Sequence, residues 1–232
     1  MRISKGKRYE YGNHFKEVDL EFVIRRCHIG DETRLSLLGK ATFLETYADS
    51  TQAADLLAFV ETEHSIERYR FRLESRFARL WVAEAALGRS AIGYAVALVS
   101  PNTGLGLEME IKRLYVLHRF HQRGLGRRLM NEILATARQD GIAELFLKVQ
   151  KANQSAVAFY SRYGFCVAGE ERFRVGARDY KALVMRLALP APAAGTLKDR
   201  TIVNPGVSAD LVAEILRSRQ AQLETQVSNA GT

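Results

Sequence analysis

Cysteine is scarce in this chain, which has only Cys27 and Cys166 among its 232 residues. Two cysteines form no metal-binding spacing and are too few for a disulfide framework. Neither lies in a motif typical of a catalytic thiol. The sequence therefore excludes a cysteine-based metal centre and a small disulfide-stabilised fold, and it offers no cysteine nucleophile.

Long apolar runs are also missing. Residues 1–20 contain no apolar segment of the signal-peptide kind, and no run reaches the length of a membrane span. No internal repeat or heptad pattern is present. We therefore expect a cytoplasmic protein with no membrane partner. The hydrophobic content of 47% is enough for a sizeable core.

Acidic residues are outnumbered by basic ones, 26 to 34, so the formal net charge is +8. A basic chain raises the question of a nucleic-acid partner. The arginines are scattered, however, and the densest group is Arg123, Arg127 and Arg128, beside two glycines. Because that group belongs to a turn with its own anion-binding pattern, we predict no nucleic-acid partner.

A Gly-x-Gly turn lies between a strand-like segment and a helical pattern in the stretch from Glu110 to Met130. Gly124 and Gly126 are placed at the start of the helix, where backbone N–H groups lack helical acceptors and the dipole favours anions. The turn therefore predicts a site for a polyphosphate. The helical spacing is carried by Leu125, Leu129, Met130, Ile133, Leu134 and Ala137.

Two other phosphate-binding loops do not fit this turn. A P-loop requires Gly-Lys-Ser/Thr after four intervening residues, and a Rossmann turn requires a third glycine where Leu129 stands. An ordinary helix-start turn, with glycines serving only its geometry, remains the alternative.

A second strand–turn–helix unit follows. Leu145–Val149 predicts a short strand, Asn153 a helix N-cap, and Gly164 a helix stop. Taken alone, Asn153 fits a simple cap and Tyr160 fits a core residue. The predicted apolar face of this helix consists of Ala156, Phe159, Tyr160 and Tyr163.

Together the two units resemble the GCN5-related N-acetyltransferase (GNAT) superfamily, over about residues 21 to 188. One departure is His121, where the family usually has glutamine or arginine. The first motif is matched by Leu114-Tyr115-Val116 and His121-Gln122-Arg123-Gly124-Leu125-Gly126, and the second by Asn153, Ala156, Phe159, Tyr160, Gly164 and Phe165.

The resemblance implies an α/β (α+β) fold with a mixed, mostly antiparallel central sheet of about six or seven strands flanked by helices. We expect a polar extension over residues 1–20, the acetyltransferase domain over 21–189, and a linker with a C-terminal segment over 190–232. Ser208 caps a predicted helix there, which is either a tail or a contact that makes a homodimer. Further strands are predicted at 22–26, 80–85, 92–99, 165–175 and 181–189, helices at 31–59 and 65–73, and a turn at 102–106.

The resemblance also implies acetyl-CoA as co-substrate, with no metal. By this resemblance, backbone groups of Leu114, Tyr115 and Val116 are expected to pair with the pantetheine arm, and Asn153 to contact the arm or an ordered water. The pyrophosphate binds the turn formed by His121, Gln122, Arg123, Gly124, Leu125, Gly126 and Arg127.

Tyr160 would face the thioester sulfur as general acid. A thiol has a pKa of about 8.5 and a phenol about 10, so Tyr160 can give the leaving thiolate a proton or a hydrogen bond. Glu108 and Glu110 alternate with apolar residues and should share one face of a strand. We predict Glu110, which is nearer the Leu-Tyr-Val segment, as the base; a solvated sheet face is the alternative.

The acceptor site is the least specific part. The segment Thr42–Asp49 resembles bacterial spermidine/spermine-type acetyltransferases, which makes Glu45 and Tyr47 candidate ligands for an ammonium group, with Asp49 and Glu63 beside them. An ordinary amphipathic helix is the alternative. The predicted function is acetyl transfer to a primary amine, a polyamine or another small amine. The alternatives are peptide or protein N-acetylation and a non-catalytic acyl-CoA-binding module.

Overall fold

The computed structural model describes residues 21–102, 106–175 and 178–190. The predicted extension before residue 21, and the linker and helix predicted after residue 190, lie outside these ranges. The elements in chain order are β1 (Phe22–Arg26), α1 (Glu32–Tyr47), α2 (Ala53–Glu63), α3 (Ile66–Glu74), β2 (Ala78–Ala85), β3 (Ala91–Asn102), β4 (Gly106–Val116), a 3₁₀ turn (His118–Phe120), α4 (Leu125–Gln139), β5 (Ile142–Gln150), α5 (Gln154–Ser161), β6 (Cys166–Val175) and β7 (Arg178–Ala188).

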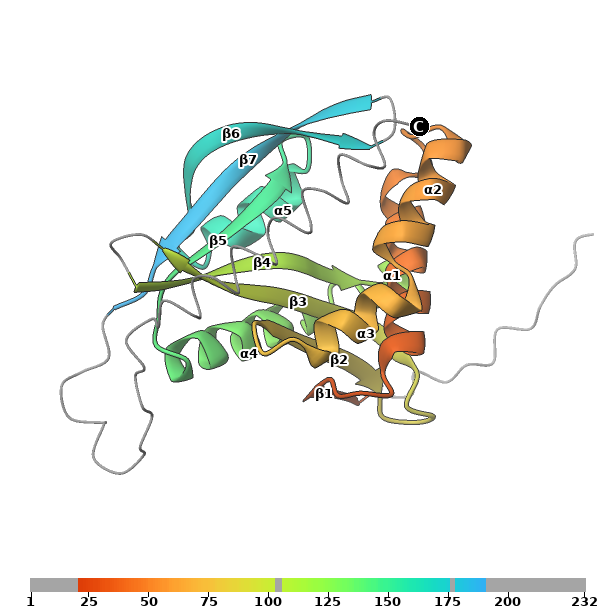
Figure 1. Cartoon of the computed structure of the whole chain (residues 1–232), viewed down its shortest axis with the longest axis horizontal. Helices are drawn as coiled ribbons and strands as arrows, with labels where there is room; N and C mark the ends of the chain where they lie inside the picture. Colours follow the sequence, from red (N-terminus) through yellow and green to blue (C-terminus); the bar gives the residue numbers. More distant parts are fainter. Residues whose placement is uncertain (1–20, 103–105, 176–177, 191–232) are drawn as a thin grey trace, which may run out of the picture.

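The strands form one sheet in the order β1-β2-β3-β4-β5-β7-β6 (Figure 1). The β4–β5 pair is parallel and the other five pairs are antiparallel. The parallel pair requires a crossover, and α4 supplies it. The predicted mixed, mostly antiparallel sheet flanked by helices is confirmed.

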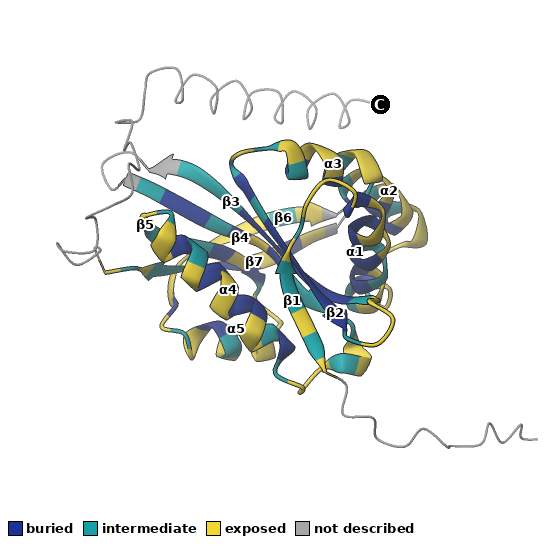
Figure 2. Ribbon diagram, turned by 90° about the horizontal axis from the view of Figure 1, so that it is seen from below, coloured by how far each residue is buried: buried dark blue, intermediate teal, exposed yellow. Residues whose placement is uncertain are grey.

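The helices cover both faces of the sheet (Figure 2). Along β3, Ala95 and Ala97 pack toward α4, whereas Tyr94 and Val96 pack toward α1 and α3. This period of two is expected for a strand buried on both faces. The predicted apolar face of α4 is confirmed, since all of its members are buried: Leu125, Leu129, Met130, Ile133, Leu134 and Ala137.

The single helix predicted over residues 31–59 is wrong. Helix α1 ends at Tyr47 and α2 begins at Ala53. Residues 49–52 are polar, and such side chains compete with helical backbone bonds. A contact with the sheet also stabilises the break between the two helices. The Tyr180 hydroxyl on β7 lies 2.8 Å from Thr51 Oγ1 and donates to the Ser50 carbonyl at 3.3 Å.

Helices α1 and α3 approach closely at Gly39, in the middle of α1. His64 and Tyr69 are buried there, and His64 Nδ1 lies 3.0 Å from the Tyr69 hydroxyl. A Cβ on Gly39 would lie 2.2 Å from His64 Nδ1 and 2.4 Å from the Tyr69 hydroxyl. The absence of a Cβ at Gly39 therefore allows the close approach of the two helices, although glycine is a poor helix former.

We expect Gly39→Ala to lower the free energy of unfolding by about 1–3 kcal/mol, the usual cost of overpacking a core. The gain in helix propensity, up to about 1 kcal/mol, offsets only part of this. Urea unfolding measures the change. Gly169→Ala is the control, since a Cβ there meets nothing within 4 Å; equal stability of both variants would contradict the prediction.

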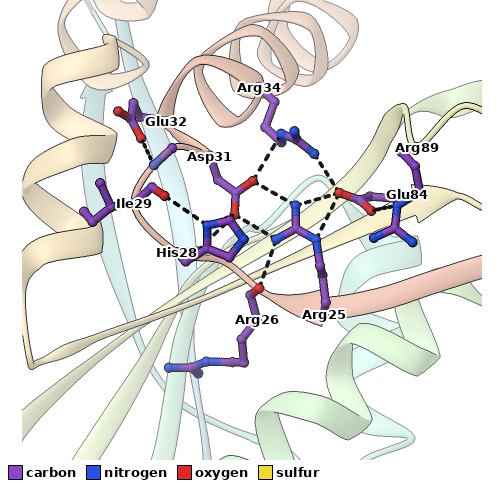
Figure 3. Close-up of polar contacts among 10 residues, drawn as sticks. Arg25, Arg26, His28, Ile29, Asp31, Glu32, Arg34, Glu84 and Arg89 are labelled. Carbon is purple, nitrogen blue, oxygen red and sulfur yellow. Dashed lines mark hydrogen bonds and ion pairs between the residues drawn. The ribbon is translucent and has the colours of Figure 1, made fainter.

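A cluster of buried charges ties the start of α1 to the sheet (Figure 3). Arg25 on β1 donates to both Asp31 oxygens at 2.8 Å and to Glu84 on β2 at 2.7 Å. Arg34 and Arg89 also contact Glu84, at 2.7 and 2.9 Å. The side chains of Asp31 and Glu84 are only 1% and 0% exposed. The arginines therefore offset the desolvation cost of burying the two carboxylates.

Candidate active site

Strands β4 and β5 separate partway along their length. They pair from Leu107 to Ile111, and the last pair joins Ile111 to Leu147. Beyond it β4 continues on β3, and β5 continues on β7 (Figure 1). In the described part of the chain, no strand pairs with the β5 side of residues 114–116. The free backbone groups of Leu114–Val116 can therefore bond an extended ligand, as a sheet edge does; the Val116 carbonyl is excepted, because it contacts His121 Nε2 at 2.7 Å.

A β-bulge lies where the strands separate. Val96 of β3 pairs with Arg113 and Ala97 pairs with Ile111, so Lys112 is the extra residue on β4. A bulge changes which face the following side chains occupy. Arg113 is consequently buried on the side of the sheet that α2 and α3 cover. Without the bulge its side chain would point toward α4 instead.

The candidate base Glu110 lies just before this bulge. Met109 and Ile111 are buried in the cluster under α4, so Glu108 and Glu110 face the other side of the sheet, as predicted. Glu110 Oε1 accepts from Lys112 Nζ at 3.2 Å. Glu108 is held by its neighbours Ser100, at 3.2 Å, and Arg186, at 3.7 Å.

The turn after β4 has the geometry of an anion site. Gly124 is the N-cap of α4 in the left-handed conformation, with φ +76°, and Gln122 also has a positive φ of +62°. The first helical bond runs from the Arg128 N–H to the Gly124 carbonyl at 3.0 Å. The N–H groups of Leu125, Gly126 and Arg127 precede this bond and are available to an anion. The side chains of Arg123 and Arg127 are exposed beside them.

His121, the residue that departs from the family pattern, folds back onto the end of β4. Its Nε2 donates to the Val116 carbonyl at 2.7 Å, and its N–H donates to the His118 carbonyl at 3.0 Å. Both groups are thus occupied within the turn. A direct contact of His121 with a pyrophosphate stays a prediction, and the histidine has a structural role that the sequence pattern did not show.

Helix α5 follows β5 and begins at Gln154. Asn153 Oδ1 accepts from the Ala156 N–H at 3.0 Å and from the Ser155 hydroxyl at 2.9 Å, so the predicted N-cap is confirmed. The amide nitrogen of Asn153 is the group left for a ligand. A coenzyme contact of Asn153 stays a prediction.

Tyr160 lies on the buried side of α5. Its ring packs against Phe159 and Phe165, with centroid distances of 5.2 and 5.8 Å. The residue is 9% exposed, and burial raises the pKa of its phenol to about 12. The hydroxyl is therefore a hydrogen-bond donor throughout the neutral and mildly alkaline range.

The two predicted acceptor ligands lie at the end of α1. Glu45 accepts from the His118 N–H at 3.0 Å and so joins α1 to the turn after β4. Tyr47 is buried against Phe43, with a centroid distance of 4.5 Å. Burial, followed by interaction with the Tyr115 hydroxyl, raises the pKa of Tyr47 above its ordinary value. Both residues therefore flank β4, while a role in acceptor binding stays a prediction.

Comparison with known proteins identifies the family. Residues 42–165, more than half of the chain, match the model of the Acetyltransferase (GNAT) family. The chain belongs to the GNAT family. An uncharacterized N-acetyltransferase of Mycobacterium bovis is 28% identical over 155 residues, which cover 67% of this chain and 96% of that protein. N-alpha-acetyltransferase 50 of Danio rerio is 32% identical over 97 residues, covering 38% of this chain and 58% of that protein.

A solved GNAT structure shares the fold. The PaiA N-acetyltransferase of Thermoplasma acidophilum, in complex with coenzyme A, superposes with a TM-score of 0.61 at 21% identity. The match covers 73% of this chain and 100% of that one. This GNAT protein is thus an acetyl-CoA-dependent N-acetyltransferase.

Within residues 21–102, 106–175 and 178–190, no group of three or more His, Cys, Asp or Glu side chains could hold a metal ion. None of the helices in these ranges has the length and apolar character needed to span a membrane.

Glu63 is not a free carboxylate in this GNAT domain. Arg113 and Arg72 approach its Oε2 at 3.1 and 3.3 Å, and Arg68 approaches its Oε1 at 3.3 Å. Burial alone would raise the pKa of Glu63, but the three guanidinium groups lower it to about 2. Its carboxylate is thus already paired with guanidinium groups, which disfavours the predicted role of Glu63 in binding a substrate ammonium. Local sequence patterns do not indicate this cluster, because its members meet only through the bulge at Lys112 and the packing of α2 and α3.

The conformation of Gly124 gives a test of the turn. We expect Gly124→Ala to lower the free energy of unfolding by about 1–2 kcal/mol, since a Cβ makes the left-handed conformation costly. Gly126→Ala is the matched control: this residue lies inside α4, and an added Cβ comes no closer than 3.8 Å to any neighbour. Its stability should be unchanged or raised by up to about 1 kcal/mol. Equal denaturation midpoints for the two variants would contradict this account of the turn.

Proposed function

We propose that this GNAT protein transfers the acetyl group of acetyl-CoA directly to a small primary amine in a ternary complex. The observation that carries the proposal is the separation of β4 from β5 after Ile111. It leaves strand-edge groups on Leu114–Val116, apart from the Val116 carbonyl that His121 occupies, for the pantetheine arm. The N-terminus of α4, with the turn from His121 to Arg127, lies beyond the strand for the pyrophosphate.

We assign the steps of the reaction to individual residues. Glu110 accepts the proton of the attacking ammonium, directly or through water. Backbone N–H groups near Tyr115 polarise the thioester carbonyl as an oxyanion hole. Tyr160 donates to the sulfur as the C–S bond breaks, and Asn153 contacts the arm of the coenzyme.

Direct transfer is supported by the state of the thiols. Cys27 and Cys166 are both free, and burial raises the pKa of Cys27 to about 12. A protonated thiol is a poor nucleophile, so Cys27 is unsuited to carry the acetyl group. Free thiols also fit a reducing compartment, and we place the protein in the cytoplasm on that ground.

Among small amines we favour an acceptor with one ammonium group over a polyamine. Arginines pair with Glu63, and Glu45 accepts from a backbone N–H, so two of the carboxylates predicted to bind a polyamine are already engaged. A peptide N-terminus is the second candidate. It is favoured by the partial similarity to N-alpha-acetyltransferase 50 of Danio rerio.

A thiol-release assay with acetyl-CoA tests these alternatives. Monoamines, polyamines, amino acids and N-terminal peptides are compared at equal concentration, and calorimetry measures coenzyme A binding in parallel. Turnover with a monoamine supports the proposal, and turnover confined to spermidine or to peptides would replace the acceptor. Coenzyme binding without thiol release from any amine would instead indicate the non-catalytic module.

A further inference from the structure

Lys112 brings an amine of the protein itself to the candidate base. It is the extra residue of the β-bulge on β4, one position beyond the last β4–β5 pair. Its Nζ lies 3.2 Å from Glu110 Oε1, and its side chain is 41% exposed. The ammonium group is therefore already within hydrogen-bond reach of a carboxylate, at the point where the two strands separate.

This position coincides with the place an acceptor amine must take. An amine that loses its proton directly to Glu110 has to bring its nitrogen to about 2.6–3.2 Å from the carboxylate. If the pantetheine arm pairs with Leu114–Val116, the thioester end can extend toward Ile111, and Lys112 lies between these residues in sequence. The structure thus brings a primary amine and the candidate base together, on the stretch of β4 that the thioester would reach.

We propose that Lys112 is a self-acetylation site of this enzyme. The inference rests on the proposed function, because it uses the same base and the same acetyl donor. The Lys112 ammonium gives one proton to Glu110, which passes it to solvent. The neutral amine forms a C–N bond with the thioester carbonyl carbon, the C–S bond breaks, and the second amine proton neutralises the departing coenzyme A thiolate. The products are N-acetyl-lysine, coenzyme A and one released proton.

Lys148 provides a matched comparison within the same chain. It lies on β5, directly after Leu147, and its side chain is 42% exposed, almost the same as that of Lys112. Its ammonium, however, is paired with Glu171 on β6 at 2.5 Å. Spontaneous acetylation by the thioester should reach two equally exposed lysines at similar rates, whereas a reaction assisted by Glu110 should favour Lys112.

The experiment is a time course of the full-length chain with acetyl-CoA that carries a ¹³C-labelled acetyl group, read by peptide mass spectrometry. We expect Lys112 to be labelled at least about tenfold faster than Lys148, with a first-order rate independent of protein concentration. In Glu110→Gln the labelling of position 112 should fall to the rate of Lys148, which itself stays unchanged. Lys112→Arg keeps the positive charge and should take no label at position 112.

Equal initial rates at Lys112 and Lys148 overturn the proposal, as does fast labelling that survives Glu110→Gln. The amine panel, run on the same preparation, separates this outcome from failure of the proposed function. Turnover of an added amine with slow labelling of Lys112 overturns self-acetylation alone. Absence of both overturns the two together, and fast Glu110-dependent labelling without turnover of any added amine supports self-acetylation while removing the proposed acceptor class.

Discussion

Replacing Tyr160 with phenylalanine should lower kcat about 10- to 100-fold and leave the free energy of unfolding nearly unchanged. The ring contacts with Phe159 and Phe165 remain, so the core is preserved. What is lost is one hydrogen bond to a developing thiolate, and a hydrogen bond to a charged group contributes about 1.5–3 kcal/mol. Steady-state thiol release at saturating acetyl-CoA measures the effect.

The buried environment determines which kind of acid Tyr160 is. Its pKa of about 12 lies about three to four units above that of an ordinary thiol, so complete proton transfer to the thiolate is unfavourable. A hydrogen bond that strengthens as the C–S bond breaks fits this pKa better than full transfer. Because the pKa is raised, the donating form persists as the pH rises and is lost only near pH 12. The wild-type rate should therefore show no decline due to Tyr160 between about pH 7 and 10.

Tyr163→Phe is the matched control for this prediction. It removes a hydroxyl just beyond the same helix, where the contact with the Arg127 carbonyl is long, at 3.4 Å. Its kcat should equal that of the wild type. Full turnover by Tyr160→Phe would remove the acid role of Tyr160, and a loss well beyond 100-fold would indicate that the proton itself is transferred.

Replacing Arg25 with methionine should lower the free energy of unfolding by about 3–5 kcal/mol, the usual result of removing one member of a buried ion cluster. The change removes the better buried of the two arginines, Arg25 and Arg34, that bridge the fully buried carboxylates of Asp31 and Glu84 (Figure 3). Arg34 and Arg89 remain, but both are more exposed than Arg25. Urea denaturation at pH 7 measures the loss.

The acid dependence of stability gives a second observable for the same cluster. Burial would raise the pKa of Asp31, but hydrogen bonds from Arg25 and from the His28 N–H lower it to about 2, below the ordinary value of 3.8. A carboxyl group with a lowered folded-state pKa contributes stability above its unfolded pKa and loses it as the pH falls. Wild-type stability should therefore decline between about pH 4 and pH 2, and Arg25→Met should show a smaller decline from Asp31.

Lys148→Met is the control for Arg25→Met. It removes an equally well-formed ion pair whose members are both exposed, and such pairs contribute about 0–1 kcal/mol. Equal losses in the two variants would show that burial of Asp31 and Glu84 carries no special cost.

Local sequence patterns were sufficient for much of the fold. The apolar spacing from Leu125 to Ala137 predicted α4 because a helix buries one face with a period near 3.6 residues. The capping role of Asn153 followed from the preference of its side chain for a helix start. The break between α1 and α2 was missed, because it depends on the Tyr180 hydroxyl of a strand more than a hundred residues away.

The sequence by itself determined the family of this protein, since both motifs consist of residues close together in the chain. The tertiary structure decided how the site is arranged. The separation of β4 from β5 depends on which neighbour each strand keeps, and the bulge at Lys112 depends on the register with β3. Glu63 looked like a free carboxylate in the sequence, but the packing of α2 against α3 and β4 pairs it with three arginines. Strand pairing and helix packing depend on contacts between residues far apart in the sequence, so local residue patterns do not predict them.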